Sequence, residues 1–218
     1  MSQHTLTLLR FTYKKLKEKL TVSDSKKLFH EKFPYVIPGL YKRIVDEMLV
    51  ELNLLNHQNE FKQDFLFCVG LTETFKELMK GYKPEKHLDL LFESLCSSTN
   101  FEANEIKEIS QKSQKEFKDK PSKDVLKLLN KESNYKLYPS RILNLGMYII
   151  ISNSPDIKGK NESEIIKLLS DIFEKFNLSI NKAEKDIGIY KSSITKMEQA
   201  KELIEELRKK DKKKDQKQ

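Results

Sequence analysis

The sequence predicts an all-α fold, a helical bundle of about eight or nine helices that ends in a long C-terminal coiled-coil-like helix. Three observations support this class. Only six of the 218 residues are glycine and six are proline, so turn-forming residues are scarce. Charged residues make up 34% of the chain and hydrophobic residues 38%, which suits helices with one solvated and one buried face. No Asn-Gly or Asp-Gly turn separates segments of alternating polarity, as a β-hairpin would require.

The bundle helices are predicted from segments in which apolar residues recur every three or four positions, the spacing of one helix face. The segment 39–55 shows this spacing most clearly, and the segment 141–151 is the most apolar. The predicted helices cover 25–33, 39–55, 65–80, 85–98, 101–117, 125–132, 141–151 and 162–176. We expect the helices from 39–55 through the apolar one at 141–152 to form one bundle.

Capping residues mark where several of these helices begin. Pro38 stands immediately before the first strong helix, where the missing N–H of proline costs nothing. Asp64 and Asn100 are the expected N-caps of the segments that follow them. Asn161 with Glu164, three residues later, has the spacing of a capping box. We therefore expect each of these helices to begin at the residue after its cap.

The final helix is predicted from an unbroken apolar seam. Its members, Ala183, Ile187, Tyr190, Ile194 and Met197, are spaced 4, 3, 4 and 3, close to a coiled-coil heptad. The chain therefore divides into a basic N-terminal extension at 1–20, the bundle at 21–178, the long helix at 179–207 and a lysine-rich disordered tail at 208–218. We expect the first turns of the long helix to dock on the bundle and the rest to project.

The positive charge of the chain belongs to its two ends. The net charge is +8, to which residues 1–20 contribute +4 and residues 208–218 contribute +5, so the body between them carries −1. A nearly neutral body disfavours a broad nucleic-acid groove across the bundle.

The N-terminal segment at residues 1–20 is amphipathic, because a helix there would place leucines on one face and lysines mostly on the opposite face. That pattern is typical of a helix on an anionic membrane surface, and an unstructured extension is an equal alternative.

The sequence motifs of common enzyme and metal sites are absent. The four histidines lie far apart and form no H-E-x-x-H or H-x-x-H pair, and no glycine-rich phosphate loop or G-x-S-x-G motif occurs. Cys68 and Cys96 each lie in an apolar stretch, which favours buried, reduced thiols. Glu47 and Glu51 share one helix face, and we interpret them as a solvated or salt-bridged flank in which Arg43 pairs with Glu47. We predict no catalytic residues, no metal site and no cofactor.

Six blocks of the sequence occur together in a characteristic order and spacing. They read TVSDSKKLFHEKFP, GLYKRIVDEMLVELNLL, FLFCVGLTETFKELMKGYKPE, LFESLC, YPSRILNLGMY and AEKDIGIYKSSITKMEQAKELI. In this order the chain resembles the thylakoid formation protein family of cyanobacteria and chloroplasts, also called photosystem II biogenesis proteins. The resemblance extends from Thr21 to Lys214. It implies an all-helical protein with a long C-terminal coiled-coil-like helix, and it implies no cofactor and no catalytic residue.

The resemblance also implies a role in thylakoid membrane biogenesis and in photosystem II assembly and repair. The implied partners are an FtsH-type membrane protease and photosystem II assembly or repair intermediates. We therefore expect a non-enzymatic accessory protein, cytoplasmic and peripherally associated with the thylakoid membrane. The apolar ridge of the final helix is the expected partner-binding site, and its residues are Tyr190, Ile194, Met197, Ile204 and Leu207. The alternative is that this ridge packs on the protein's own bundle, which we favour for the part from Ala183 to Ile194 and which remains equally open for Ile204 and Leu207.

The basic tail has two interpretations, a device that biases the protein toward an anionic membrane and a solvating end. Its charged residues are Arg208, Lys209, Lys210, Lys212, Lys213 and Lys214. Each contributes about 1 kcal/mol at best near such a membrane, so the tail alone does not anchor the protein. The alternative function is a nucleic-acid- or ribosome-associated helical protein that uses its basic ends. The neutral body and the missing recognition motif count against nucleic acid as a partner.

Overall fold

The predicted all-α fold is confirmed. The computed structural model describes residues 19–131, 137–157 and 159–215, and within these it consists of nine α-helices and one short 3-10 helix, without a strand. The elements are α2 (Val22–Lys32), α3 (Gly39–Asn56), α4 (Phe65–Leu78), η1 (Glu85–His87), α5 (Leu88–Ser97), α6 (Ala103–Phe117), α7 (Ser122–Lys131), α8 (Arg141–Ser152), α9 (Glu162–Lys175) and α10 (Ile180–Asp215). The amphipathic pattern of 1–20 lies outside the described residues, apart from Lys19 and Leu20.

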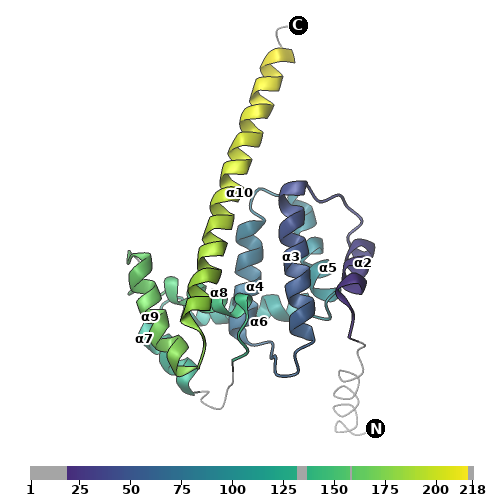
Figure 1. The fold of residues 1–218 in the computed structure, drawn as a ribbon. Helices are drawn as coiled ribbons and strands as arrows, with labels where there is room; N and C mark the ends of the chain where they lie inside the picture. The colour runs from purple at the N-terminus through teal and green to yellow at the C-terminus, as the bar shows by residue number, and fades with distance from the viewer. Residues whose placement is uncertain (1–18, 132–136, 158, 216–218) are drawn as a thin grey trace.

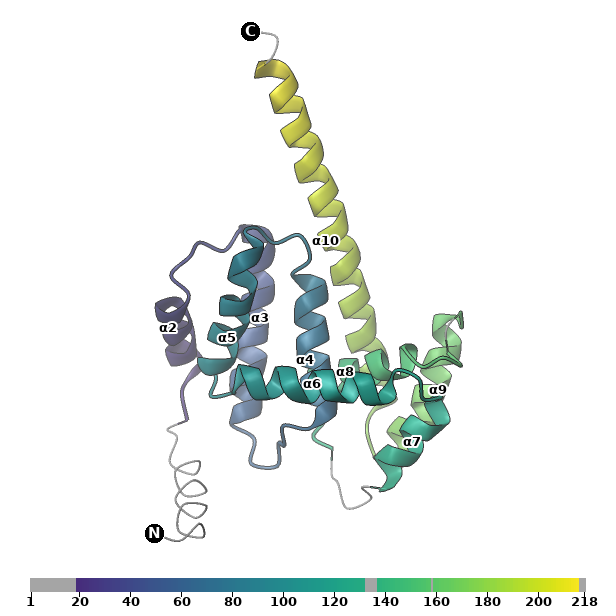
Figure 2. The ribbon, with the colours of Figure 1, turned by 180° about the vertical axis from the view of Figure 1, so that it is seen from behind.

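The helices form a bundle from which one long helix projects (Figure 1). Helices α3, α4 and α5 run roughly alongside one another, and α6 lies across α4 and α5 (Figure 2). Helices α7 and α9 lie together near the start of α10. Helix α10 packs against α8, α9 and α4 and then extends beyond the bundle, so its two ends have different surroundings.

Two of the predicted N-caps are confirmed. A carboxylate oxygen of Asp64 accepts a hydrogen bond from the Phe67 backbone N–H at 2.7 Å. Asn161 and Glu164 form the predicted capping box, each side chain accepting from the other's backbone N–H at 3.0 and 2.9 Å. These bonds satisfy N–H groups that have no partner inside the helix. The sequence therefore determines where α4 and α9 begin.

The prediction that Asn100 caps the next helix is wrong. Helix α6 begins at Ala103, and Asn100 has a φ of 65°, in the left-handed region. Across it the Phe101 N–H donates to the Cys96 carbonyl at 2.9 Å, which is the hydrogen bond of a Schellman motif. Asparagine tolerates the left-handed conformation better than most residues. Asn100 therefore terminates α5 instead of starting α6.

Helices α4 and α8 cross in the middle of the bundle at a pair of glycines. A Cβ added to Gly70 would lie 2.0 Å from the Ile142 carbonyl oxygen, and one added to Gly146 would lie 1.9 Å from that of Leu66. No side chain larger than hydrogen fits at either position without moving a backbone. The two glycines thus fix how closely these apolar helices approach.

The core consists of two clusters of buried side chains on either side of this crossing. One cluster includes Leu52, Phe67 and Leu95 and lies mainly among α2 to α6, with contributions from α8 and α10. The other includes Met147 and Phe173 and lies mainly among α7 to α10, with contributions from α4 and α6. Both cysteines are fully buried with free thiols, as predicted. Partly buried Tyr190 on α10 packs against both clusters, so the long helix helps to join them.

The first part of α10 docks on the bundle, as expected from its apolar seam. Ala183 and Ile187 have no exposed surface. Between them in the sequence, Asp186 is also buried, and its carboxylate accepts a hydrogen bond from the Asn144 side-chain amide of α8 at 2.8 Å. A buried carboxylate is tolerated only with such a partner. This contact fixes the position of α10 along α8.

The end of α10 differs from the sequence prediction. The helix continues to Asp215 instead of ending at residue 207, so a disordered tail beginning at residue 208 is not what the structure shows. The reason is intrinsic: lysine and arginine are good helix formers, and no glycine or proline interrupts the segment. Residues 216–218 of the predicted tail lie outside the described residues.

Candidate functional site

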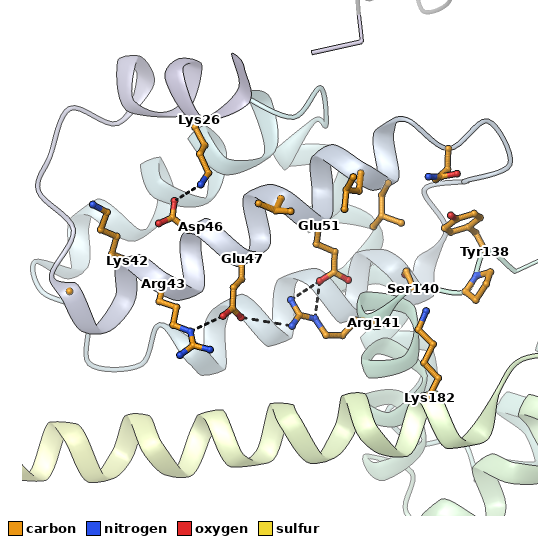
Figure 3. A pocket seen from close by; sticks show the side chains of 16 residues that line it. Lys26, Lys42, Arg43, Asp46, Glu47, Glu51, Tyr138, Ser140, Arg141 and Lys182 are labelled. Carbon is orange, nitrogen blue, oxygen red and sulfur yellow. Dashed lines mark hydrogen bonds and ion pairs between the residues drawn. The ribbon is translucent and has the colours of Figure 1, made fainter. Parts of the chain in front are cut away.

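An open groove follows α3, and Figure 3 shows the part of it that is bordered by α2 and by the segment before α8. This part has a volume of about 890 Å³ and is lined by α3 along most of its length, by Lys26 of α2, by residues 138–141 and by Lys182 of α10. A second hollow of about 560 Å³ lies between the first half of α3 and the middle of α10. Arg43 and Glu47 line both parts, so we treat them as one site, the α3–α10 groove.

A chain of ion pairs follows the wall of the groove (Figure 3). The Arg43 Nε lies 2.8 Å from Glu47 Oε1, which is the predicted pairing of these two residues. Arg141 Nη1 lies 3.9 Å from Glu47 Oε2, and Arg141 Nη2 lies 2.7 Å from Glu51 Oε2. The predicted salt-bridged flank therefore exists, and it reaches across to α8.

Glu51 also holds the start of α8. Its Oε1 accepts a hydrogen bond from the Ile142 backbone N–H at 3.2 Å while its other oxygen binds Arg141. Burial raises the pKa of the Glu51 carboxyl, and Arg141 with the Ile142 N–H opposes this by favouring the charged form. Sequence reasoning missed this contact because Arg141 is 90 positions away and no local pattern signals it.

The apolar residues at the end of α10 are exposed. Leu203 is 58% exposed, Ile204 40% and Leu207 51%, and we call these three the projecting stripe. Their spacing places them on one face of the helix. The Lys201 side chain still lies beside Gly81 of the bundle, so the stripe begins where α10 leaves the bundle. Large apolar side chains exposed together in this way mark interaction surfaces.

The structure divides the predicted partner-binding residues into two groups. Ile204 and Leu207 belong to the projecting stripe. Met197 is buried in the core at 5% exposure, because the seam that it extends packs on the bundle, so it does not lie on the exposed surface of α10. Tyr190 and Ile194 are half-buried against the core, and burial raises the pKa of the Tyr190 phenol. Leu203 was missed because it lies outside the heptad seam.

The predicted basic tail lies mostly within α10. Arg208, Lys209, Lys210, Lys212, Lys213 and Lys214 continue the helix after the projecting stripe. The C-terminal part of α10 thus combines the exposed projecting stripe with a final segment whose sequence is strongly basic.

Two further features are absent from the described part of the chain. There, no three histidine, cysteine, aspartate or glutamate side chains lie close enough together to hold a metal ion. Among the same residues, no helix is long and apolar enough to cross a membrane.

Comparison with known proteins identifies the family to which this chain belongs. The family model described as thylakoid formation protein matches residues 21–218. The chain belongs to this family. The curated relative Protein Thf1 from Prochlorococcus marinus (strain MIT 9312) is 81% identical over 199 residues, covering 91% of this chain and 99% of that protein. Protein Thf1 from Synechococcus sp. (strain CC9605) is 39% identical over 192 residues, covering 85% and 87%.

The fold is also shared with a solved structure. The structure of Psb29 superimposes with a TM-score of 0.79 at 28% sequence identity, covering 89% of this chain and 98% of that chain. Together these matches confirm the resemblance that the six sequence blocks carry. Membership of the family links the protein to thylakoid formation.

Proposed function

We propose that the protein is a non-enzymatic accessory protein of thylakoid biogenesis and of photosystem II assembly and repair. In this role it binds and stabilises an FtsH-type membrane protease through the projecting stripe of α10. The observation that carries the proposal is the exposure of Leu203, Ile204 and Leu207 on a helix that has left its bundle. Family membership supports the cellular setting, since the family is one of thylakoid formation.

The energetics suit an interface with a modest apolar centre. Complete burial of one leucine or isoleucine contributes about 1.5–3 kcal/mol, and the three side chains are 40–58% exposed in the free protein. Covering the remaining surface therefore contributes roughly 1 kcal/mol for each residue. We therefore expect the projecting stripe to form the apolar centre of a protein interface, with polar residues of both partners forming its rim.

The basic end of α10 supports peripheral contact with the cytoplasmic face of the thylakoid. An anionic membrane surface attracts each lysine or arginine by about 1 kcal/mol. This attraction orients α10 toward the membrane in which the protease resides, while the apolar contact supplies specificity. Photosystem II assembly or repair intermediates are the further partners that this location brings within reach.

The proposal is tested by recovering partners from thylakoid membranes with two forms of the protein. One is the full chain and the other ends after Lys201, which keeps Ala183, Ile187 and Met197 in the core. We expect the full chain to recover the FtsH-type protease and the shortened chain to lose it. Equal recovery by both forms contradicts the proposed contact.

A cellular measurement tests the proposed role separately from the contact. Deletion of the gene is expected to slow the replacement of damaged photosystem II after strong light, because less protease remains to remove damaged subunits. The shortened chain should restore this recovery less well than the full chain does. Unchanged recovery after deletion contradicts the role itself.

A further inference from the structure

The charges of the α3–α10 groove are unbalanced. Its three acidic residues, Asp46, Glu47 and Glu51, each lie within 4 Å of a basic side chain of the protein itself. Four exposed lysines of the groove form no ion pair with any described residue; they are Lys42, Lys182, Lys185 and Lys196. The acidic groups are therefore neutralised internally, whereas the lysines remain available to an outside anion.

Apolar surface lies between these lysines. Leu54, 53% exposed, lines the end of the groove near α8, and Ile189, 44% exposed, lines its middle. Half-buried Leu40 and Ile44 of α3 complete the opposite wall. A hollow with apolar walls and basic edges between two helices suits a third helix that is apolar on one side and acidic on its flanks.

The groove and the projecting stripe share one face of α10. Ile189, Ser193, Ala200, Ile204 and Leu207 follow one another at steps of 4, 7, 4 and 3, which keeps them on one side of the helix. Ile189 and Ser193 line the groove, and Ile204 and Leu207 lie beyond the bundle. A ligand helix lying along α10 in the groove is thus directed toward the exposed end.

We propose that the α3–α10 groove binds an acidic amphipathic helix of a partner protein. Charge complementarity selects this occupant. The basic N-terminal extension of the protein itself carries the wrong sign, with five basic residues and one acidic residue in 1–20. An anionic membrane has the right sign, but it is flat and does not fill the hollows on either side of Glu47. The inference goes beyond the proposed function, since it does not depend on the protease.

A selection experiment with the full chain tests the proposal. The probe is a display library of helical peptides of about 20 residues, with leucine at the a and d positions and lysine or glutamate in equal amounts elsewhere. We expect the bound peptides to be enriched in glutamate and to weaken in affinity as salt rises, because the attraction is partly ionic. Selection of lysine-rich peptides, of peptides without charge preference, or of none overturns the proposal.

Charge-reversal variants locate the binding site. Lys185→Glu with Lys196→Glu changes the α10 wall of the groove, and both side chains are exposed, so the fold should persist. We expect this double variant to bind the selected acidic peptide about tenfold or more weakly. The control, Lys123→Glu with Lys167→Glu, makes the same charge change on α7 and α9 and should bind normally. Equal weakening in both variants shows attraction to net charge alone and overturns the groove as the site.

Two further binding measurements distinguish the groove from a membrane-binding surface and from the exposed end of α10. Vesicles that contain an anionic lipid should not compete with the selected peptide; competition that the groove variant abolishes means that the groove binds membrane and overturns the proposal. The chain that ends after Lys201 should bind the peptide normally even where it loses the protease. Loss of both ligands in this shortened chain assigns the peptide to the end of α10 and also overturns the proposal.

Discussion

Glu51 of α3 binds Arg141 and the first turn of α8 with a single carboxylate. Its Oε2 lies 2.7 Å from Arg141 Nη2, and its Oε1 accepts the Ile142 N–H at 3.2 Å. The Glu51 side chain is 17% exposed and that of Arg141 31%, so solvent screens the pair only partly. This contact fixes α8 against α3 and forms one wall of the α3–α10 groove.

Replacing Glu51 should therefore destabilise the protein more than replacing an exposed partner in the same chain of ion pairs. We expect Glu51→Gln to lower the free energy of unfolding by about 1–3 kcal/mol, the usual effect of losing hydrogen bonds to a charged group. Arg43→Ala removes a pair whose arginine is 86% exposed, and should cost no more than about 0.5 kcal/mol. Urea unfolding followed by circular dichroism measures both. Equal losses contradict the special role of Glu51.

The glycine crossing of α4 and α8 should not tolerate a methyl group. Gly70→Ala or Gly146→Ala places a Cβ within about 2 Å of a carbonyl oxygen, so the helices must separate and lose packing. We expect either variant to lose several kcal/mol of stability or to fail to fold, as judged by thermal unfolding. Gly188→Ala is the matched control, because its added Cβ meets nothing within 4 Å beyond the neighbouring backbone of its own helix. That variant should gain about 0.5–1 kcal/mol. Normal stability of the Gly70 and Gly146 variants contradicts the crossing geometry.

The buried Asn144–Asp186 hydrogen bond should control how firmly α10 docks. Asp186→Ala leaves the Asn144 amide buried without its partner and is expected to cost about 1–3 kcal/mol. Glu184→Ala removes a neighbouring exposed acid and should have little effect. Hydrogen exchange should accelerate in the first turns of α10 more than in α3. A uniform acceleration throughout the chain means that this bond does not act locally.

The two cysteines should be unreactive while the protein is folded. Both are fully buried, and burial raises the pKa of each thiol to about 12, so at pH 8 only roughly one thiol in ten thousand is ionised. Labelling with an aromatic disulfide reagent should be slow up to about pH 9 and rapid in denaturing urea. Labelling of the folded protein at the rate of a free thiol contradicts the burial of both side chains.

Local sequence patterns predict the elements that depend on neighbouring residues. The capping box of Asn161 and Glu164 and the N-cap Asp64 act over three residues, so the sequence shows them directly. The docking of α10 through Ala183 and Ile187 follows from heptad spacing in the same way. The role of Asn100 was predicted wrongly because asparagine is favoured both as the N-cap of a helix and in the left-handed position after a helix, and the sequence does not distinguish the two.

Contacts between distant segments are the part that no local pattern predicts. Arg141 meets Glu51 across 90 positions, and the two glycines of the crossing lie in separate apolar helices. The exposed side chain of Leu203 also requires the structure, because exposure depends on where α10 leaves the bundle. The α3–α10 groove could not be predicted either, because its walls come from helices that are far apart in the sequence and its exposed residues depend on how these helices pack.

The most direct test of the central claim is the affinity of full-length variants for the purified FtsH-type protease in detergent. Leu203→Asp with Leu207→Asp places two charges in the projecting stripe, and Thr195→Asp with Gln199→Asp adds the same charges at the same spacing about two turns earlier on α10, at exposed positions before the stripe. We expect the stripe variant to bind at least about tenfold more weakly than the unmodified protein, a loss of about 1.4 kcal/mol or more, and the control to bind normally. Unchanged affinity of the stripe variant would contradict the claim that this surface binds the protease.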